Sequence, residues 1–138
     1  MKIIGLDHLG IAVRSLEQAV ELYEALGLVP EVTHEVPSEK VRVAFLPVGG
    51  SRLELLEPTD PDSVIARFLD RRSGLHHVCL LVEDIEQALN EMKARGVRLV
   101  DEVPRVGAGG CRVAFVHPDS AAGLLLELKE PTPVAEGG

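Results

Sequence analysis

The chain carries Gly5-Leu6-Asp7-His8 near its start and Gly74-Leu75-His76-His77 again 69 positions later. In that register, residues 5–27 and 74–96 share nine identities in 23 positions. The repeat continues with a small drift in offset: Arg42-Val43-Ala44-Phe45 returns as Arg112-Val113-Ala114-Phe115, and Leu53-Glu54-Leu55 returns as Leu126-Glu127-Leu128. Short insertions between turns produce such drift, so we interpret the chain as one structural module that occurs twice.

Each copy has the pattern of a β-α-β-β-β module. A strand with alternating small and large residues comes first, at Leu6–Val13 and at Leu75–Val82. A helix-start signature follows each strand, Ser15 with Gln18 in the first copy and Asp84 with Gln87 in the second. A glycine suited to a left-handed C-cap, Gly27 or Gly96, then ends the helix. Three extended segments are then expected in each copy, at residues 28–36, 40–48 and 51–57, and at 97–103, 111–117 and 123–129.

The predicted fold class is α+β, with two tandem β-α-β-β-β modules forming a curved mixed sheet around a metal-binding cleft. The modules span about residues 4–57 and 74–130, and connector 58–73 carries a short helix from Ser63 to Asp70. Neither half, at roughly 60 residues, would bury a comfortable core alone, so we expect a single domain over residues 1–138. The glycine-rich stretch 106–110 is expected to form either a loop over the cleft or a hairpin, and residues 131–138 a frayed tail.

Composition narrows the classes of partner. A formal net charge of −8 disfavours a nucleic-acid or anionic-membrane surface as the main partner, although a small anionic ligand remains compatible with it. The chain has neither a long apolar run nor the features of a signal peptide, which makes the cytoplasm the expected location. Cys79 and Cys111 form no C-x-x-C pair, so neither a disulfide framework nor a zinc knuckle is expected.

Four polar residues recur at matched places of the repeat: His8 and His77 in the first strands, and Glu54 and Glu127 between leucines. One strand histidine is more often a core or surface residue, and one strand glutamate usually faces solvent. Recurrence of both types in an otherwise diverged repeat favours a shared metal site. Two imidazoles and two carboxylates suit Co²⁺, Mn²⁺, Zn²⁺ or Ni²⁺. His76 is expected to be a neighbour of this site.

The sequence resembles the vicinal oxygen chelate superfamily, and within it most closely the methylmalonyl-CoA epimerases. The resemblance runs from about residue 4 to residue 130. It rests on the repeated strand and glutamate segments, together with G-L-H-H at residues 74–77, G-A-G-G at 107–110 and F-V-H-P at 115–118.

The resemblance implies an isomerase that interconverts (2R)- and (2S)-methylmalonyl-CoA, an acyl-CoA substrate, a homodimer and one divalent metal ion per subunit, Co²⁺ foremost. It places His8, His77 and Glu127 as ligands, with Glu54 where some relatives have Gln. Glu127 is the expected general base. Some epimerases have a second glutamate where this chain has Val43, so Glu54, Glu35, Glu39 or a water is expected to return the proton. The cations proposed for the CoA phosphates are Lys40, Arg42, Arg105 and Arg112.

Two other functions are compatible with the same residues. A lactoylglutathione lyase of the glyoxalase I type applies the same enolate chemistry to a glutathione hemithioacetal. A ligand-sequestering module of this fold would need no metal, and four ligand-type residues would then have no role. An extradiol dioxygenase is a weaker alternative, because it would use a two-His-one-carboxylate iron site, usually on a longer chain.

Overall fold

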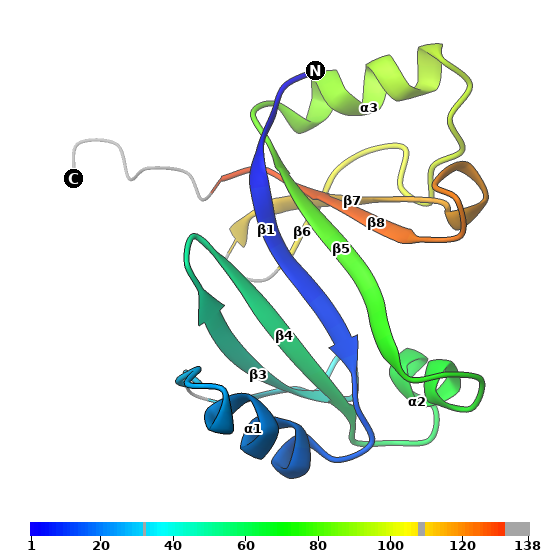
Figure 1. Ribbon diagram of the computed structural model, residues 1–138. Coiled ribbons are helices and arrows are strands. Elements are labelled where there is room, and N and C mark those ends of the chain that lie inside the picture. Colours follow the sequence, from blue (N-terminus) through cyan, green and yellow to red (C-terminus); the bar gives the residue numbers. More distant parts are fainter. Residues whose placement is uncertain (32, 108–109, 132–138) are drawn as a thin grey trace. The chain divides into compact units, whose positions relative to one another are not determined.

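The structure, a computed structural model, describes residues 1–31, 33–107 and 110–131. It confirms the predicted α+β class (Figure 1). In chain order the elements are β1 (Ile3–Ala12), α1 (Leu16–Ala25), β2 (His34–Val36), β3 (Val41–Val48), β4 (Ser51–Pro58), α2 (Val64–Leu69), β5 (Gly74–Val82), α3 (Ile85–Ala94), β6 (Arg105–Val106), β7 (Arg112–Val116) and β8 (Leu125–Lys129).

The strands are hydrogen-bonded in the order β2-β3-β4-β1-β5-β8-β7-β6. The sheet is mixed as predicted, because β1 and β4 run parallel whereas β2–β3, β3–β4, β6–β7 and β7–β8 are antiparallel. The repeat is confirmed at the level of elements: β1-α1-β2-β3-β4 matches β5-α3-β6-β7-β8, and α2 lies in the connector.

Two compact units make up the described chain. The central unit is His8–His77, and the terminal unit comprises Met1–Asp7 together with the chain from Val78 onward. Each unit therefore contains part of β1 and part of β5, and the unit boundary does not coincide with the boundary between the two sequence copies.

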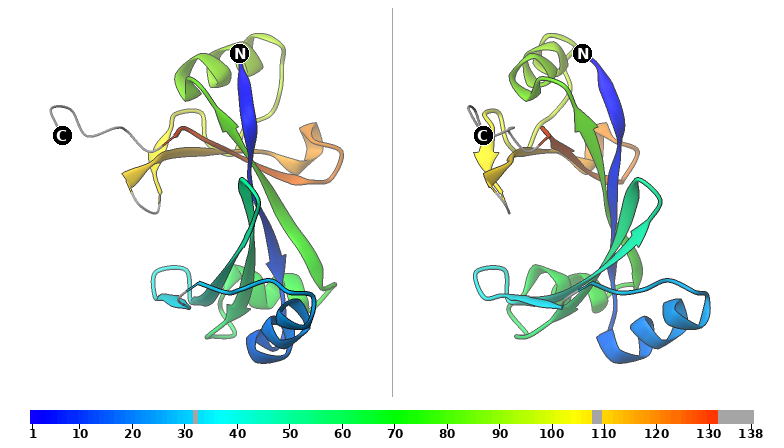
Figure 2. Two further views of the ribbon diagram at one scale, coloured as in Figure 1. Left: turned by 60° about the vertical axis from the view of Figure 1, so that its left-hand side comes forward. Right: turned by 90° about the vertical axis from the view of Figure 1, so that its left-hand side faces the viewer.

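Equivalent residues of the repeat form the core of each unit. In the central unit α1 lies beside β3 and β4, and Leu16, Ala44 and Leu55 are buried there (Figure 1). In the terminal unit α3 packs on β7, and the buried residues include Ile85, Ala114 and Leu128. Figure 2 shows the C-terminal end of β1 leading directly into α1. The repeat thus places the same apolar positions in both cores.

The predicted helix ends are confirmed in both copies. The Ser15 hydroxyl accepts a hydrogen bond from the Gln18 backbone N–H at 3.2 Å, and the Asp84 carboxylate accepts one from the Gln87 N–H at 3.1 Å. These contacts satisfy N–H groups that have no partner within the helix. The residue that follows each C-cap, Gly27 or Gly96, has a positive φ, at 93° and 77° respectively, as a left-handed C-cap requires.

The strand expected over residues 97–103 was wrong. Leu99 makes only an isolated bridge to Val116, and the short strand β6 comes later, at Arg105–Val106. The Asp101 side chain explains the interruption, because its carboxylate accepts the Phe115 backbone N–H at 2.8 Å in place of a strand carbonyl. Both Val100 and Asp101 then donate their N–H groups to the Phe115 carbonyl.

Other expectations were met in part. Among the described residues of the segment expected over 28–36, only His34–Val36 form a strand, β2, whereas β3, β4, β7, β8 and α2 lie within a residue or two of their expected bounds. Residues 108–109 of the glycine-rich stretch and residues 132–138 of the expected tail lie outside the described residues. No helix in the described part of the chain has the length and apolar character needed to cross a bilayer.

Candidate metal centre

Three adjacent strands, β4, β1 and β5, bring the candidate ligands of the central unit together. In the parallel β1–β4 pair, His8 lies in register with Arg52, and Gly10 lies in register with Glu54. His8 and Gly10 share one face of β1 because side chains alternate along a strand. His77 comes from the first part of β5.

His8, Glu54 and His77 form a cluster whose potential ligand atoms all lie within 4.8 Å of one another. The two Nε2 atoms of the histidines are 3.0 Å apart, and His8 Nδ1 is 3.2 Å from Glu54 Oε2. Both histidines are buried, and the Glu54 side chain is 12% exposed. Three of the four predicted ligands are therefore together in one unit.

The Nδ1 atom of each histidine ring also has a neighbour. His8 Nδ1 faces the Glu54 carboxylate, and His77 Nδ1 lies 2.9 Å from Nδ1 of His76. Burial, with a smaller contribution from the positive charge of Arg72, lowers the pKa of His76. A neutral His76 ring can accept the Nδ1–H of His77, which leaves His77 Nε2 as the lone-pair nitrogen. His76 is thus a neighbour of the cluster, as the sequence predicted.

Gly10 provides the space that the His77 ring occupies. An ideal Cβ built on Gly10 would lie 2.1 Å from Cε1 of His77 and 2.4 Å from its Nδ1. Any larger residue at this position would push the imidazole aside. The sequence alone does not reveal this role, because the repeat partner of Gly10 is Cys79 and the pair therefore carries no symmetry signal.

This donor set fits a divalent transition-metal ion. Two ring nitrogens at right angles, each about 2.1 Å from one ion, would be separated by about 3.0 Å. The Nε2 atoms of His8 and His77 are separated by 3.0 Å. Imidazole nitrogen with carboxylate oxygen suits Co²⁺, Mn²⁺, Ni²⁺ or Zn²⁺.

Glu127, the fourth predicted ligand, lies on β8 in the terminal unit. Its register repeats that of Glu54: Glu127 faces Phe115 across β7–β8, just as Glu54 faces Phe45 across β3–β4. The matched register supports the alignment from which Glu127 was selected. Its convergence with the other three residues stays a prediction.

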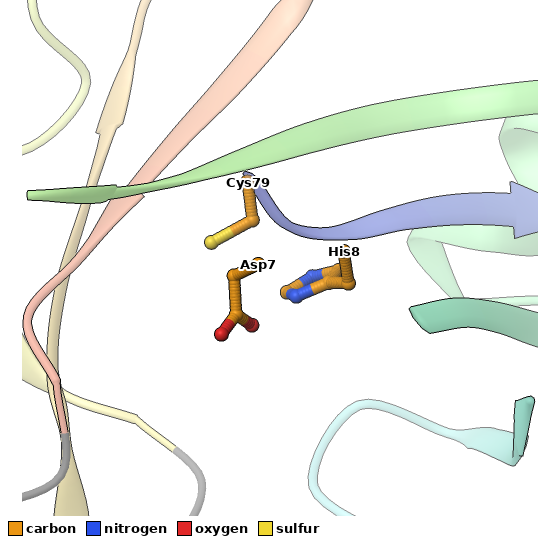
Figure 3. A group of neighbouring side chains, drawn as sticks. All are labelled: Asp7, His8 and Cys79. Carbon is orange, nitrogen blue, oxygen red and sulfur yellow. The ribbon is translucent and has the colours of Figure 1, made fainter. Parts of the chain in front are cut away.

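Asp7 and Cys79 are potential ligands in the terminal unit that were not predicted from the sequence, and Figure 3 shows them with His8. The Asp7 carboxylate and the Cys79 sulfur lie within 4.8 Å of each other, and Cys79 is fully buried. Asp7 also forms an ion pair with Lys129 at 3.2 Å. The Lys129 ammonium therefore already pairs with one oxygen of this carboxylate, Oδ2.

The residues considered for proton return and for binding the CoA phosphates differ in burial and in their ion pairs. Val43 is buried in an apolar cluster, whereas Glu35 and Glu39 are exposed. The four cations considered for CoA phosphates all have carboxylate partners: Lys40 with Asp62, Arg42 with Glu57, Arg105 with Asp101, and Arg112 with Glu86 and Glu130. Binding of a phosphate by any of them would therefore compete with an existing ion pair.

Comparison with known proteins identifies the family. Residues 7–115 match the glyoxalase/bleomycin resistance protein/dioxygenase superfamily. The chain belongs to this superfamily. The mitochondrial methylmalonyl-CoA epimerase of Homo sapiens is 37% identical over 128 residues, which cover 91% of this chain and 73% of that protein.

Solved structures of superfamily members agree with this assignment. Methylmalonyl-CoA epimerase from Mycobacterium tuberculosis is 38% identical and superposes with a TM-score of 0.85, covering 95% of this chain and 90% of that one. A methylmalonyl-CoA epimerase in complex with methylmalonyl-CoA and NH₄⁺ is 33% identical, with a TM-score of 0.86 and coverage of 96% and 98%. The predicted resemblance to epimerases, which are isomerases, is confirmed.

Proposed function

We propose that this protein interconverts the (2R) and (2S) forms of methylmalonyl-CoA. The observation that carries the proposal is the buried cluster of His8, Glu54 and His77, in a chain whose relatives are named for this reaction. A sequestering protein of the same fold would have no use for two facing imidazoles beside a carboxylate. The acyl-CoA substrate is supported by the related epimerase whose structure contains methylmalonyl-CoA.

The chemistry of the substrate suits such a site. The proton on C2 lies between a thioester and a carboxylate, and its removal produces an enolate. A divalent cation held by His8, Glu54, His77 and Glu127, with Co²⁺ foremost and Mn²⁺, Ni²⁺ or Zn²⁺ as alternatives, would supply stabilisation for the negative charge on the substrate oxygens. Burial of the two histidines makes such electrostatic stabilisation stronger than it would be in water.

In this proposal Glu127 removes the C2 proton as general base. The return of a proton to the opposite face needs a second donor, and the buried Val43 cannot supply one. Glu54 has its carboxylate in contact with Arg52 and His8, and it is the one glutamate of the central unit found in the cluster. Because the Glu54 carboxylate is already engaged by Arg52, His8 and the proposed cation, we assign the return of the proton to a water beside it, and not to the exposed Glu35 or Glu39.

The deciding experiment is metal-dependent incorporation of solvent deuterium into methylmalonyl-CoA. Purified protein loaded with Co²⁺ is expected to exchange the C2 hydrogen and to convert one epimer into the other, whereas chelated protein does neither. A parallel assay with the glutathione hemithioacetal tests the lyase alternative. Hemithioacetal turnover without C2 exchange would overturn the epimerase proposal in favour of that lyase, and absence of stoichiometric metal after growth with Co²⁺ or Mn²⁺ would favour sequestration.

The resemblance further suggests a homodimer built from single-domain subunits. Light scattering on the purified protein measures the oligomer directly, and a mass twice that of the 14.9 kDa chain is expected. A monomeric mass would contradict the dimer, while it would leave the proposed chemistry to be judged by the exchange assay.

A further inference from the structure

Arg52 makes a two-point contact with the candidate ligand Glu54. The two residues lie two positions apart on β4 and so share one face of the strand. Both Nε and Nη2 of Arg52 reach the same carboxylate oxygen, Oε2 of Glu54, at 2.9 and 2.8 Å. Nε donates a hydrogen bond and Nη2 lies within ion-pair distance, so that the planar guanidinium holds this oxygen in place.

The guanidinium is itself supported from the neighbouring strand. Its central carbon lies 5.3 Å from the ring centroid of Phe45, within the range of a cation–π contact. Phe45 is the cross-strand partner of Glu54 in the β3–β4 pair. Phe45 therefore packs against the Arg52 guanidinium and is also the cross-strand neighbour of Glu54.

The contact also extends to His8. Oε2 of Glu54, already bonded to Arg52, is the atom that lies 3.2 Å from His8 Nδ1. Within the described part of the chain, every hydrogen bond and ion pair of Glu54 ends on Oε2. Oε1 of Glu54 is thus available as a ligand atom for a cation on the cluster.

We infer that Arg52 is a positioning residue of the metal centre, which fixes Glu54 through Oε2 and, through Glu54, orients the ring of His8. The inference rests on the proposed metal site. Neither composition nor the repeat signals Arg52, because its counterpart 73 positions later is Leu125. The role therefore belongs to one copy only.

The test compares Co²⁺ affinity, measured by isothermal titration calorimetry, between the wild-type protein and Arg52→Lys. This substitution keeps the positive charge and removes the two-point contact, so that any change reports position and not charge. Loss of a group that orients a ligand typically weakens metal binding 10- to 100-fold, and we expect about a tenfold rise in Kd. Arg98→Lys is the matched control, because Arg98 forms an exposed ion pair with Asp119 in the terminal unit, and its Kd is expected to equal that of the wild type.

A double-mutant cycle with Glu54→Ala separates positioning from a general structural effect. If Arg52 acts through Glu54, Arg52→Lys has no further effect on Kd once Glu54 is alanine. An unchanged or tighter Kd in Arg52→Lys, or a tenfold loss that persists in the Glu54→Ala background, overturns the inference while leaving the metal centre intact. A wild-type protein that binds no Co²⁺ overturns the metal centre and this inference together.

Discussion

At the scale of single residues, Gly10 leaves the space in which the His77 ring lies. Gly10→Ala places a methyl group where the His77 ring lies, since the built Cβ comes within 2.1 Å of Cε1. We expect a loss of about 1–3 kcal/mol in the free energy of unfolding from overpacking, and Co²⁺ binding weaker by about tenfold or more. Urea unfolding and calorimetric titration measure the two effects.

Gly5→Ala is the control for this substitution. Gly5 lies on the same strand, β1, and a Cβ there would meet nothing within 4 Å. Because alanine loses less conformational entropy than glycine when a strand folds, we expect the free energy of unfolding of Gly5→Ala to be unchanged or slightly higher. Equal Co²⁺ affinity in the two alanine variants would show that Gly10 does not make room for a ligand.

Substitution of Glu127 tests its proposed role as the general base of the epimerisation. Glu127→Gln removes the proposed base while keeping nearly the same shape, so we expect epimerisation to fall by roughly two to four orders of magnitude. The fold should be retained, which circular dichroism and thermal unfolding check. Near-wild-type C2 deuterium exchange in this variant would remove Glu127 from the role of base.

The residues that symmetry marks could be predicted, and those that it does not mark were missed. His8 and His77 recur at matched positions, and the structure brings them together. In the repeat alignment Gly10 is equivalent to Cys79 and Arg52 is equivalent to Leu125. Neither residue type recurs, so these positions look like any others at which the two copies have diverged. Their roles depend on contacts between strands, which a single sequence does not display.

Elements in both copies are tied together by the same arrangement of charges. Glu57 accepts the Leu16 N–H at the start of α1 at 2.8 Å, and Glu130 accepts the Ile85 N–H at the start of α3 at 2.9 Å. An arginine pairs with each glutamate, Arg42 with Glu57 and Arg112 with Glu130. A negative charge at a helix N-terminus is favourable, and the arginine joins it to the neighbouring strand. The sequence contained the signal, because Glu57 and Glu130 share the 73-residue offset of Glu54 and Glu127.

This arrangement predicts a specific dependence of stability on pH. The hydrogen bond from Arg112 lowers the pKa of Glu130 below its ordinary value of 4.5. A carboxyl group with a lowered pKa in the folded state stabilises the fold above its unfolded-state pKa and ceases to do so as pH falls through the folded-state pKa. Glu130→Gln is thus expected to be less stable than the wild type at pH 7, with the difference narrowing below about pH 4.5.

Urea unfolding of both proteins at pH 7 and at pH 3 measures that difference. Glu21→Gln is the control, since Glu21 is an exposed residue of α1, and its difference from the wild type should vary less with pH. A gap between Glu130→Gln and the wild type that stays constant from pH 7 to pH 3 would show that the Glu130 charge contributes nothing to stability.

Helix positions were predicted well because the local chemistry is decisive there. The ends of α1 and α3 follow from cap residues that hydrogen-bond within three positions of themselves. The failure over residues 97–103 has the opposite cause, since Asp101 bonds to Phe115, which lies 14 positions away in the sequence. A pattern of alternating residues cannot reveal that a side chain replaces a backbone acceptor.

At the scale of the whole molecule, the proposed metal links chemistry to stability. A cation that binds the folded chain and not the unfolded one adds RT ln(1 + [L]/Kd), or about 2.7 kcal/mol at a free concentration 100 times Kd. For a chain of 138 residues this raises Tm by roughly 10 °C. We expect Co²⁺ to give such a rise by scanning calorimetry, and a chelator to reverse it. His8→Ala should abolish the rise, because it removes one of the two imidazoles whose Nε2 atoms are 3.0 Å apart. A full rise in that variant would mean that the stabilising ion binds elsewhere on the chain.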